Sequence, residues 1–289
     1  NGNYEEFKND PVVYNEFDKA YITFVYKGVN DDIDKFADLF ISKNASLCFS
    51  TYSENLLNIA SNRTETKQDV ALRIQKSGGE ILSQNYQVAT AEKLNNSEFM
   101  YEYYAVAMQK LKNMGLDVNG ILFPSGNDQI MGSPDSAKWV YSTYDYSDLY
   151  GEPYDGLEAF SSVYNRWSGT GLNDFNNDTK EIKTYIDKLI QNREWVVLYF
   201  EGLSDVNIET VSEVLDYINS KGTDTIEVVT YKKMYDRFAE KESVINNTVK
   251  TYYVSADGTG WDGTDIEDPI SLDVLNTNKI KTGDTVLFK

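Results

Sequence analysis

The chain has 289 residues, of which 41% are hydrophobic and 25% are charged, and this balance predicts a globular protein with one large core and at most a small appendage. With 27 basic and 46 acidic residues the formal net charge is -19, so we expect no nucleic-acid partner, because the field of the protein repels phosphate backbones. No apolar run approaches the roughly 20 residues that span a bilayer, so we expect no membrane insertion.

The sequence contains no histidine and a single cysteine. Imidazole is the commonest general base near neutral pH and a common nitrogen ligand of zinc, so its absence excludes the usual hydrolytic triads and every His-ligated metal site. Any catalysis must then use Asp, Glu, Tyr, Lys or Ser, and we expect no cofactor. Cys48 lies in an apolar run, where we expect a buried thiol.

Short apolar runs typical of β-strands alternate with helical patterns from residue 20 onward. Each helical pattern places apolar residues three or four positions apart, as Ile33, Phe36 and Phe40 are. In chain order the patterns predict strand 20–26, helix 31–44, strand 45–50, helix 67–76, strand 80–84, helix 98–115, strand 120–126, helix 179–192, strand 194–201, helix 208–222 and strand 226–231. Such alternation indicates an α/β fold whose parallel sheet, open or closed into a barrel, carries functional groups where its strands end.

The first strand ends in the segment TFVYKG, at 23–28. This segment and the later strand ends resemble the polysaccharide deacetylase family of carbohydrate esterases, over residues 20–240. The resemblance implies a distorted (β/α) barrel that removes acetyl groups from glycans with a bound divalent metal. The family's first motif, Thr-Phe-Asp-Asp-Gly, supplies a base and a metal ligand. Aligned on Gly28, Tyr26 and Lys27 stand where those two carboxylates would be.

The remaining motifs of the family match in outline but lack their reactive residues. In GGEILSQNYQV, Gln84 and Val88 stand at the two metal-ligating histidines. In LFPSG, which keeps the proline and the glycine of the family motif, Leu122 replaces an arginine. In WVVLYFEG, Glu201 stands at the catalytic histidine. The resemblance therefore implies the family scaffold without its catalytic residues and without its metal.

Lys27 places a positive charge where the resemblance implies a metal ion. We hypothesise that its ammonium group replaces the ion electrostatically and pairs with Glu201 or with another acid. The alternative is a solvated lysine whose aliphatic stem covers apolar surface.

A second resemblance lies at the C-terminal end. The segments YYVS and GDTVLFK resemble the opening coil of a right-handed, pectate-lyase-like parallel β-helix. One coil cannot bury its own face, so we expect the β-helix to continue in a longer protein. The expected organisation is an N-terminal segment, 1–18, a deacetylase-like domain, 19–242, a linker, 243–250, and a small β-rich element, 251–289.

Tyrosine is abundant, with 22 residues, and its ring can stack on a sugar while its hydroxyl forms hydrogen bonds. Together with polar neighbours at the expected strand ends, tyrosines form a set of candidate glycan-binding residues. The candidates are Tyr26, Gln84, Asn85, Tyr86, Tyr144, Asp145, Tyr146 and Glu201. The alternative is that these tyrosines pack the core.

Three functions are compatible with the sequence. The first is a catalytically inactive deacetylase-like domain that binds cell-wall or surface polysaccharide, or serves as a structural module, beside other subunits of an extracellular assembly such as a phage tail, a baseplate or a bacterial surface protein. The second is an active esterase or deacetylase with non-standard residues. The third is a glycosidase that uses Glu201 with Asp145 or Asp148, since glycosidases need only two carboxylic acids.

Overall fold

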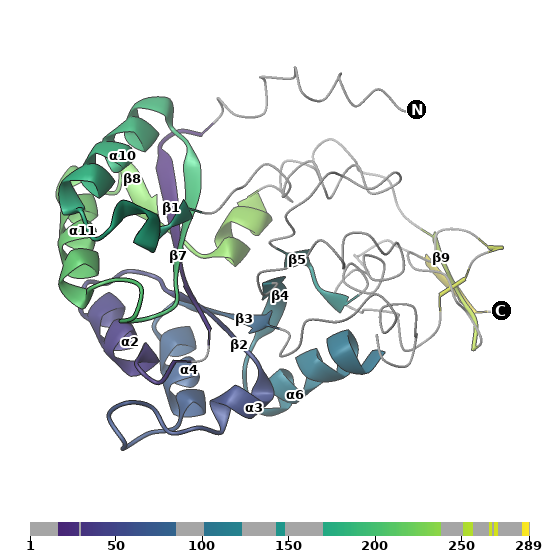
Figure 1. Ribbon diagram of the computed structural model, residues 1–289. Coiled ribbons are helices and arrows are strands. Elements are labelled where there is room, and N and C mark those ends of the chain that lie inside the picture. Colours follow the sequence, from purple (N-terminus) through teal and green to yellow (C-terminus); the bar gives the residue numbers. More distant parts are fainter. Residues whose placement is uncertain are drawn as a thin grey trace.

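Figure 1 shows the computed structural model of the chain. The structure describes residues 17–28, 30–84, 101–122, 143–147, 170–237, 251–256, 266–267, 269–270 and 285–288. Four positions named above, Asn85, Tyr86, Val88 and Asp148, lie outside the described residues. None of the helices in the described part of the chain has the length and apolar character needed to cross a membrane.

The central element is a sheet to which the described residues contribute eight strands, and every described pair in it is parallel. Seven strands follow the order β5-β4-β3-β2-β1-β7-β6, and β8 pairs with β1. Their bounds are β1 Ala20–Lys27, β2 Cys48–Thr51, β3 Glu80–Gln84, β4 Val118–Leu122, β5 Tyr146–Ser147, β6 Thr170–Gly171, β7 Trp195–Phe200 and β8 Ile226–Val228. The predicted α/β class with parallel strands is confirmed. Closure into a barrel stays a prediction, because the order of the described strands ends at β5 and at β6.

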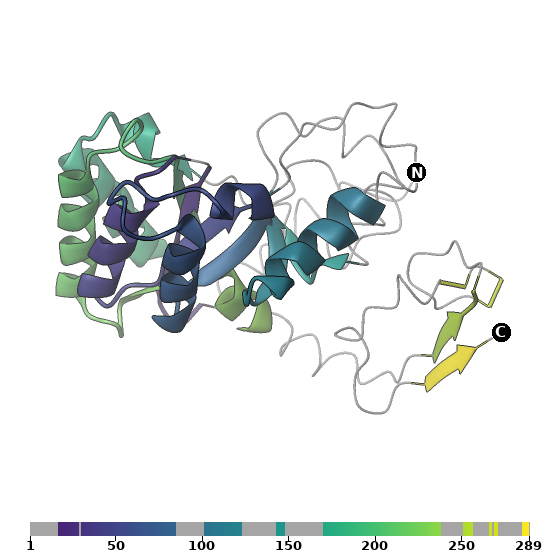
Figure 2. The same ribbon diagram turned by 90° about the horizontal axis from the view of Figure 1, so that it is seen from below.

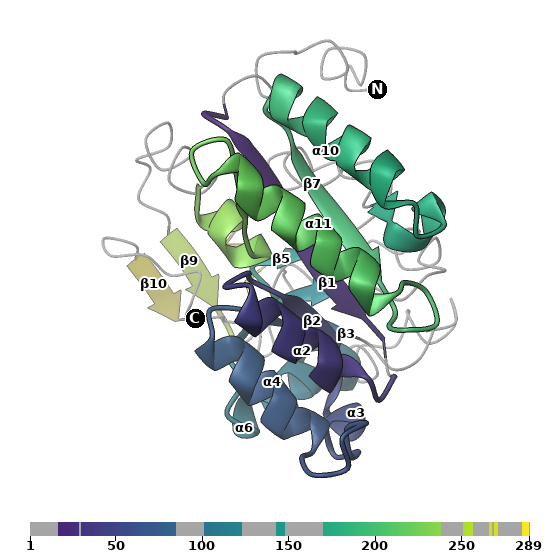
Figure 3. The same ribbon diagram turned by 90° about the vertical axis from the view of Figure 1, so that its left-hand side faces the viewer.

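Helices connect the strands, as parallel pairing requires. They are α2 Ile33–Ser42, α3 Ser53–Leu56, α4 Lys67–Lys76, the π-helix η3 Tyr101–Val106, α6 Ala107–Asn113, the 3-10 helix η4 Leu172–Phe175, α10 Thr179–Asn192 and α11 Ile208–Lys221. In Figure 3, α2, α4, α10 and α11 lie side by side in front of the sheet. Two of these helices have a side-chain cap at their N-terminus. At α4, the Thr66 hydroxyl accepts a hydrogen bond from Asp69 N, and at α10 the Asp178 carboxylate accepts one from Lys180 N.

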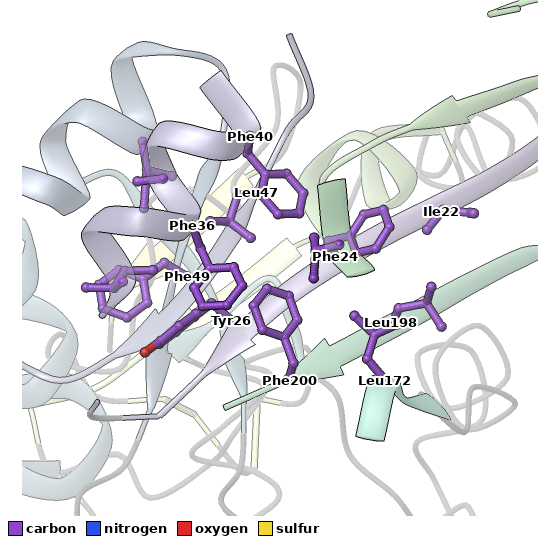
Figure 4. Close-up of a cluster of buried hydrophobic side chains, with 14 of the residues drawn as sticks. Ile22, Phe24, Tyr26, Phe36, Phe40, Leu47, Phe49, Leu172, Leu198 and Phe200 are labelled. Carbon is purple, nitrogen blue, oxygen red and sulfur yellow. The ribbon is translucent and has the colours of Figure 1, made fainter. Parts of the chain in front are cut away.

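Alternate residues of the sheet face opposite ways, and two hydrophobic clusters result. Phe24 and Phe200 belong to the main core, under the helices, and Figure 4 shows them packed there beside residues of α2. Val25 and Trp195 belong to the second cluster, on the other face. We call these two sides of the sheet the helix face and the second face.

One edge of β1 is shared by two strands. Along its first half, Ala20, Tyr21 and Ile22 pair with β8; from Val25 onward, β1 pairs with β2. The opposite edge pairs with β7 over Tyr21–Tyr26. The sheet therefore forks between β8 and β2.

A two-stranded parallel sheet near the C-terminus joins β9 Thr251–Val254 to β10 Thr285–Phe288. A bridge from Ile270 to Val254 runs parallel as well. Figure 2 shows β9 and β10 side by side. Strands are thus present in the expected β-rich element, whereas the β-helix and the domain boundaries stay predictions.

Candidate functional site

Four polar side chains lie across the carboxyl ends of four neighbouring strands. Lys27 ends β1, Ser50 lies in β2, Gln84 ends β3 and Tyr199 lies in β7. Side chains two residues apart in a strand lie on the same face of a sheet. In each of these four strands, the residue two positions earlier belongs to the second cluster, so all four side chains lie on the second face. We call this set the strand-end arc.

Contacts connect the members of the strand-end arc. Lys27 is the register partner of Ser50, and the Ser50 hydroxyl donates a hydrogen bond to Gln84 Oε1 at 3.3 Å. On the other side, Lys27 Nζ lies 5.2 Å from the centroid of the Tyr199 ring, within range of a cation–π interaction. Ser50 is buried, and the other three are partly exposed. The arc therefore offers a ligand an ammonium group, an amide and a phenol.

Glu201 follows β7 directly and is exposed. Its backbone N–H donates to Asp205 Oδ2 at 2.9 Å, and its carbonyl accepts from the amide of Asn30. Among the described residues Lys27 forms no ion pair, so the hypothesised pairing with Glu201 is wrong: the ammonium group lies against the Tyr199 ring instead.

Tyr26 is fully buried in the helix face, where its ring packs between Phe36, Phe49 and Phe200 (Figure 4). Its hydroxyl donates to Asp32 Oδ1 at 2.5 Å. Burial raises the pKa of this phenol strongly, and the hydrogen bond to Asp32 raises it further. The prediction that Tyr26 offers a face to a sugar is wrong, because Tyr26 has the orientation of Phe24 and not that of Lys27.

Tyr144 and Tyr146 are also buried, so the prediction that their rings stack on a ligand is wrong as well. The Tyr144 hydroxyl donates to Ser83 Oγ at 3.0 Å, and burial raises the pKa of that phenol. The Tyr146 hydroxyl donates to the carboxylate of Glu80. Both tyrosines act as polar core residues that connect the sheet to the segment around β5.

Asp145, between these two tyrosines, is partly buried, and its backbone N–H donates to Asn119 O at 2.8 Å. Its place as a ligand-binding residue stays a prediction.

The residues at the strand ends do not fit the divalent metal that the family resemblance implies. Such a site needs several oxygen or nitrogen ligands that converge. The strand-end arc instead holds the ammonium group of Lys27 against the Tyr199 ring, with one hydroxyl and one amide on the neighbouring strands. In the described part of the chain, no group of three or more His, Cys, Asp or Glu side chains could hold a metal ion. We therefore derive no catalytic step through a metal.

Two members of the arc, Ser50 and Tyr199, were not among the residues predicted from the sequence. A signal for Tyr199 existed: in the strand WVVLYF it has the orientation of Trp195 and Val197 and comes last before the strand ends. Knowing which alternate residues faced the helices would have selected Tyr199 and rejected Tyr26.

The fold and the strand-end arc together define a parallel α/β protein with a site at the carboxyl ends of its strands that has no carboxylate among its four members. No family model matches the chain, and no curated protein matches it either.

Solved structures with a similar course of the chain include carbohydrate esterases. One is the Xyl-CE4 domain of a multidomain xylanase from the hindgut metagenome of Trinervitermes trinervoides, at 15% identity and a TM-score of 0.45, covering 76% of this chain and 92% of that one. Another is a family 4 carbohydrate esterase from Bacillus anthracis, at 14% identity and a TM-score of 0.44, covering 76% and 83%. A third is a mutant of a CE4 family pseudoenzyme with restored enzymatic activity, at 9% identity and a TM-score of 0.45, covering 77% and 69%. Similarity at this level does not define a family.

Proposed function

We propose that this chain contains a catalytically inactive, deacetylase-like domain that binds a glycan at the strand-end arc. The observation that carries the proposal is the arc itself, with Lys27 against the Tyr199 ring; the sequence resemblance implies a carboxylate at the position of this lysine in the family. The absence of histidine from the whole sequence supports the inactivity.

The chemistry of the arc suits an acetylated or neutral sugar. The ammonium group of Lys27 is a donor for a carbonyl or hydroxyl oxygen, and the amide of Gln84 has both a donor and an acceptor for a pair of sugar hydroxyls. Tyr199 adds an aromatic ring with a hydroxyl at one end. A sugar bound there would keep its acetyl group, because among the four arc side chains no carboxylate or imidazole can activate water.

We place this domain in an extracellular assembly, such as a phage tail, a baseplate or a bacterial surface protein, with cell-wall or surface polysaccharide as its ligand. Residues 251–289 would connect it to the rest of the assembly. A single site of this size binds weakly, and several copies in an assembly would provide tight attachment.

Binding is tested by calorimetric titration with chitotetraose, a chain of N-acetylglucosamine. We expect a Kd on the order of 1 mM for the chain itself and at least about tenfold weaker binding for Lys27→Met and for Tyr199→Ala. Lys221→Met is the matched control, because Lys221 also lies over a tyrosine ring, 4.4 Å from the Tyr217 centroid, but both residues belong to α11 and not to the strand-end arc. It should bind like the unmodified chain. Equal binding by all four proteins would refute the site.

Acetate release from the same sugar measures the inactivity separately. We expect none, with or without added divalent metal. A metal-dependent rate that Glu201→Ala abolishes would favour the active esterase instead, and cleavage of the chain into shorter sugars would favour the glycosidase.

A further inference from the structure

The fork in the sheet encloses a cavity at the end opposite the strand-end arc. Its volume is about 400 Å³, at the lower end of the range of small-ligand pockets. Its walls come from the loop before β2, from the end of α11 and from β8. They carry amides, hydroxyls and aliphatic groups, among them Asn44, Ser46, Asn219, Ile226, Val228 and Thr230. The strand-end arc shares none of its residues with this cavity.

One wall of the cavity is the edge of β8 that pairs with no strand among the described residues. Ala20 N donates to Thr225 O at 3.0 Å, and Val229 N donates to Ile22 O at 2.8 Å. The backbone N–H and C=O groups of the odd-numbered residues in this segment therefore face β1. Along a strand, the N–H and C=O of successive residues point to opposite edges, so those of Val228 point away from β1, toward the cavity. The N–H of Ile226 is used by Gly222 O, at 3.2 Å.

The opposite wall is the segment that enters β2. Glu80 N donates to Leu47 O at 3.0 Å, so that carbonyl faces β3. By the same alternation, the N–H and C=O of Ser46 point away from β3, toward β1 and β8. The partner that the Ser46 N–H would have on β1 is already taken, because Ile22 O accepts from Val229 N. The β8 edge and the segment that enters β2 thus both line the cavity.

We propose that this cavity binds a short extended peptide, which adds as a strand between β8 and residues 44–46. A strand added to the β8 edge would lie about 4.8 Å from it and would form hydrogen bonds to Val228, with Ser46 in the wall of the same cavity. Three extended residues span about 10 Å. The amides, hydroxyls and aliphatic groups of the walls suit small, uncharged side chains such as Thr, Ser and Val.

Charged groups at the cavity are already paired, which also favours an uncharged peptide. Glu227 contacts Lys19 Nζ at 2.7 Å and also pairs with Lys233. The ammonium group of Lys19 donates in addition to Thr223 O at 2.8 Å. A charged ligand side chain would have to compete with these contacts.

The probe is the capped peptide acetyl-Thr-Val-Thr-amide, titrated into the isotope-labelled chain while amide NMR signals are recorded. We expect the signals of Val228 and Ser46 to shift, with a Kd on the order of 1 mM. The matched probe has an N-methyl group on its valine, which removes a backbone donor and blocks strand pairing. It should produce no shift. Equal responses to both peptides, or no response at either amide, would overturn the proposal.

A pair of substitutions tests the β8 edge. Val228→Pro removes an N–H that β1 does not use, so the β1–β8 pairing can persist, as proline is tolerated on a free strand edge. It should weaken binding of the peptide at least about tenfold. Val228→Thr keeps the N–H and the shape, and should bind normally. Unchanged binding by Val228→Pro would contradict the model of an added strand.

Hydrogen exchange of the unmodified chain provides a test that does not depend on how the variants fold. The Val228 amide should exchange much faster than the Val229 amide, which is bonded to Ile22 O, and peptide should slow it at least about tenfold. Slow exchange of Val228 without peptide would show that its edge is already paired and would refute the proposal.

Discussion

Glu80 is a buried carboxylic acid at the start of β3, and it should make the stability of the protein depend on pH. One carboxylate oxygen accepts from the Tyr146 hydroxyl; the other accepts from Lys232 N at 3.0 Å and contacts Cys48 Sγ at 3.6 Å. Burial raises its pKa from 4.5 to about 7, and the three hydrogen bonds only partly oppose this effect. Among these partners no cation contacts the carboxylate directly.

The direction in which stability changes with pH follows from proton binding. Because the folded protein holds this proton more tightly than the unfolded chain does, the stability that Glu80 contributes is fully present below pH 4.5 and is lost as the pH rises through about 7. One pKa unit corresponds to about 1.4 kcal/mol, so the whole effect is about 3 kcal/mol in the free energy of unfolding, and most of it falls between about pH 5 and pH 8.

The perturbation is Glu80→Gln, which resembles the protonated acid in shape and hydrogen bonding but does not titrate. Urea denaturation of both proteins at several values between about pH 5 and pH 8 gives the free energies of unfolding. Other carboxylic acids titrate in both proteins, so their effects cancel in the difference. We expect the variant to gain about 2 to 3 kcal/mol relative to the unmodified chain as the pH rises across this range. Parallel curves for the two proteins would refute the reasoning.

Two further substitutions test the packing of the sheet. Gly120→Ala would place a Cβ against the Tyr146 ring and 2.8 Å from Leu82 Cδ2, so we expect a loss of about 1 to 3 kcal/mol in urea denaturation, and an unchanged midpoint would contradict the contact. Tyr26→Phe keeps the buried ring but removes the hydrogen bond to Asp32, so we expect a loss of about 1 to 3 kcal/mol in the free energy of unfolding in the same assay. Binding of chitotetraose should not change. Weaker binding would show that Tyr26 contacts the ligand.

The sequence predicted the strands better than the directions of their side chains. Apolar runs such as 20–26 and 195–200 are strands in the structure, because branched and aromatic residues favour a buried pleated sheet. The glycan-binding role of Tyr26 failed for a different reason. β1 is apolar on both faces, so its pattern alone does not distinguish the helix face from the second face.

Pairing between distant segments could not be predicted from the sequence either. The fork arises because β8 and β2 meet the same edge of β1, and neither strand carries a local signal for that. The helix predicted over 98–115 is described from Tyr101 onward, and its described part is a π-helix, Tyr101–Val106, followed by α6. Hydrophobic spacing does not distinguish a π-helix from an α-helix over so short a length.

The position of β1 between β2, β7 and β8 has a consequence for biosynthesis. The indole N–H of Trp195 donates to the Thr23 hydroxyl at 3.0 Å across 172 residues of chain, and β7 pairs with one edge of β1 over Tyr21–Tyr26. At about 5 to 20 residues per second, a ribosome needs roughly 9 to 34 seconds to make the intervening chain. During that interval the most apolar strand of the nascent protein has an open edge, so the N-terminal half must wait, or be held by a chaperone, until the residues that complete its sheet emerge.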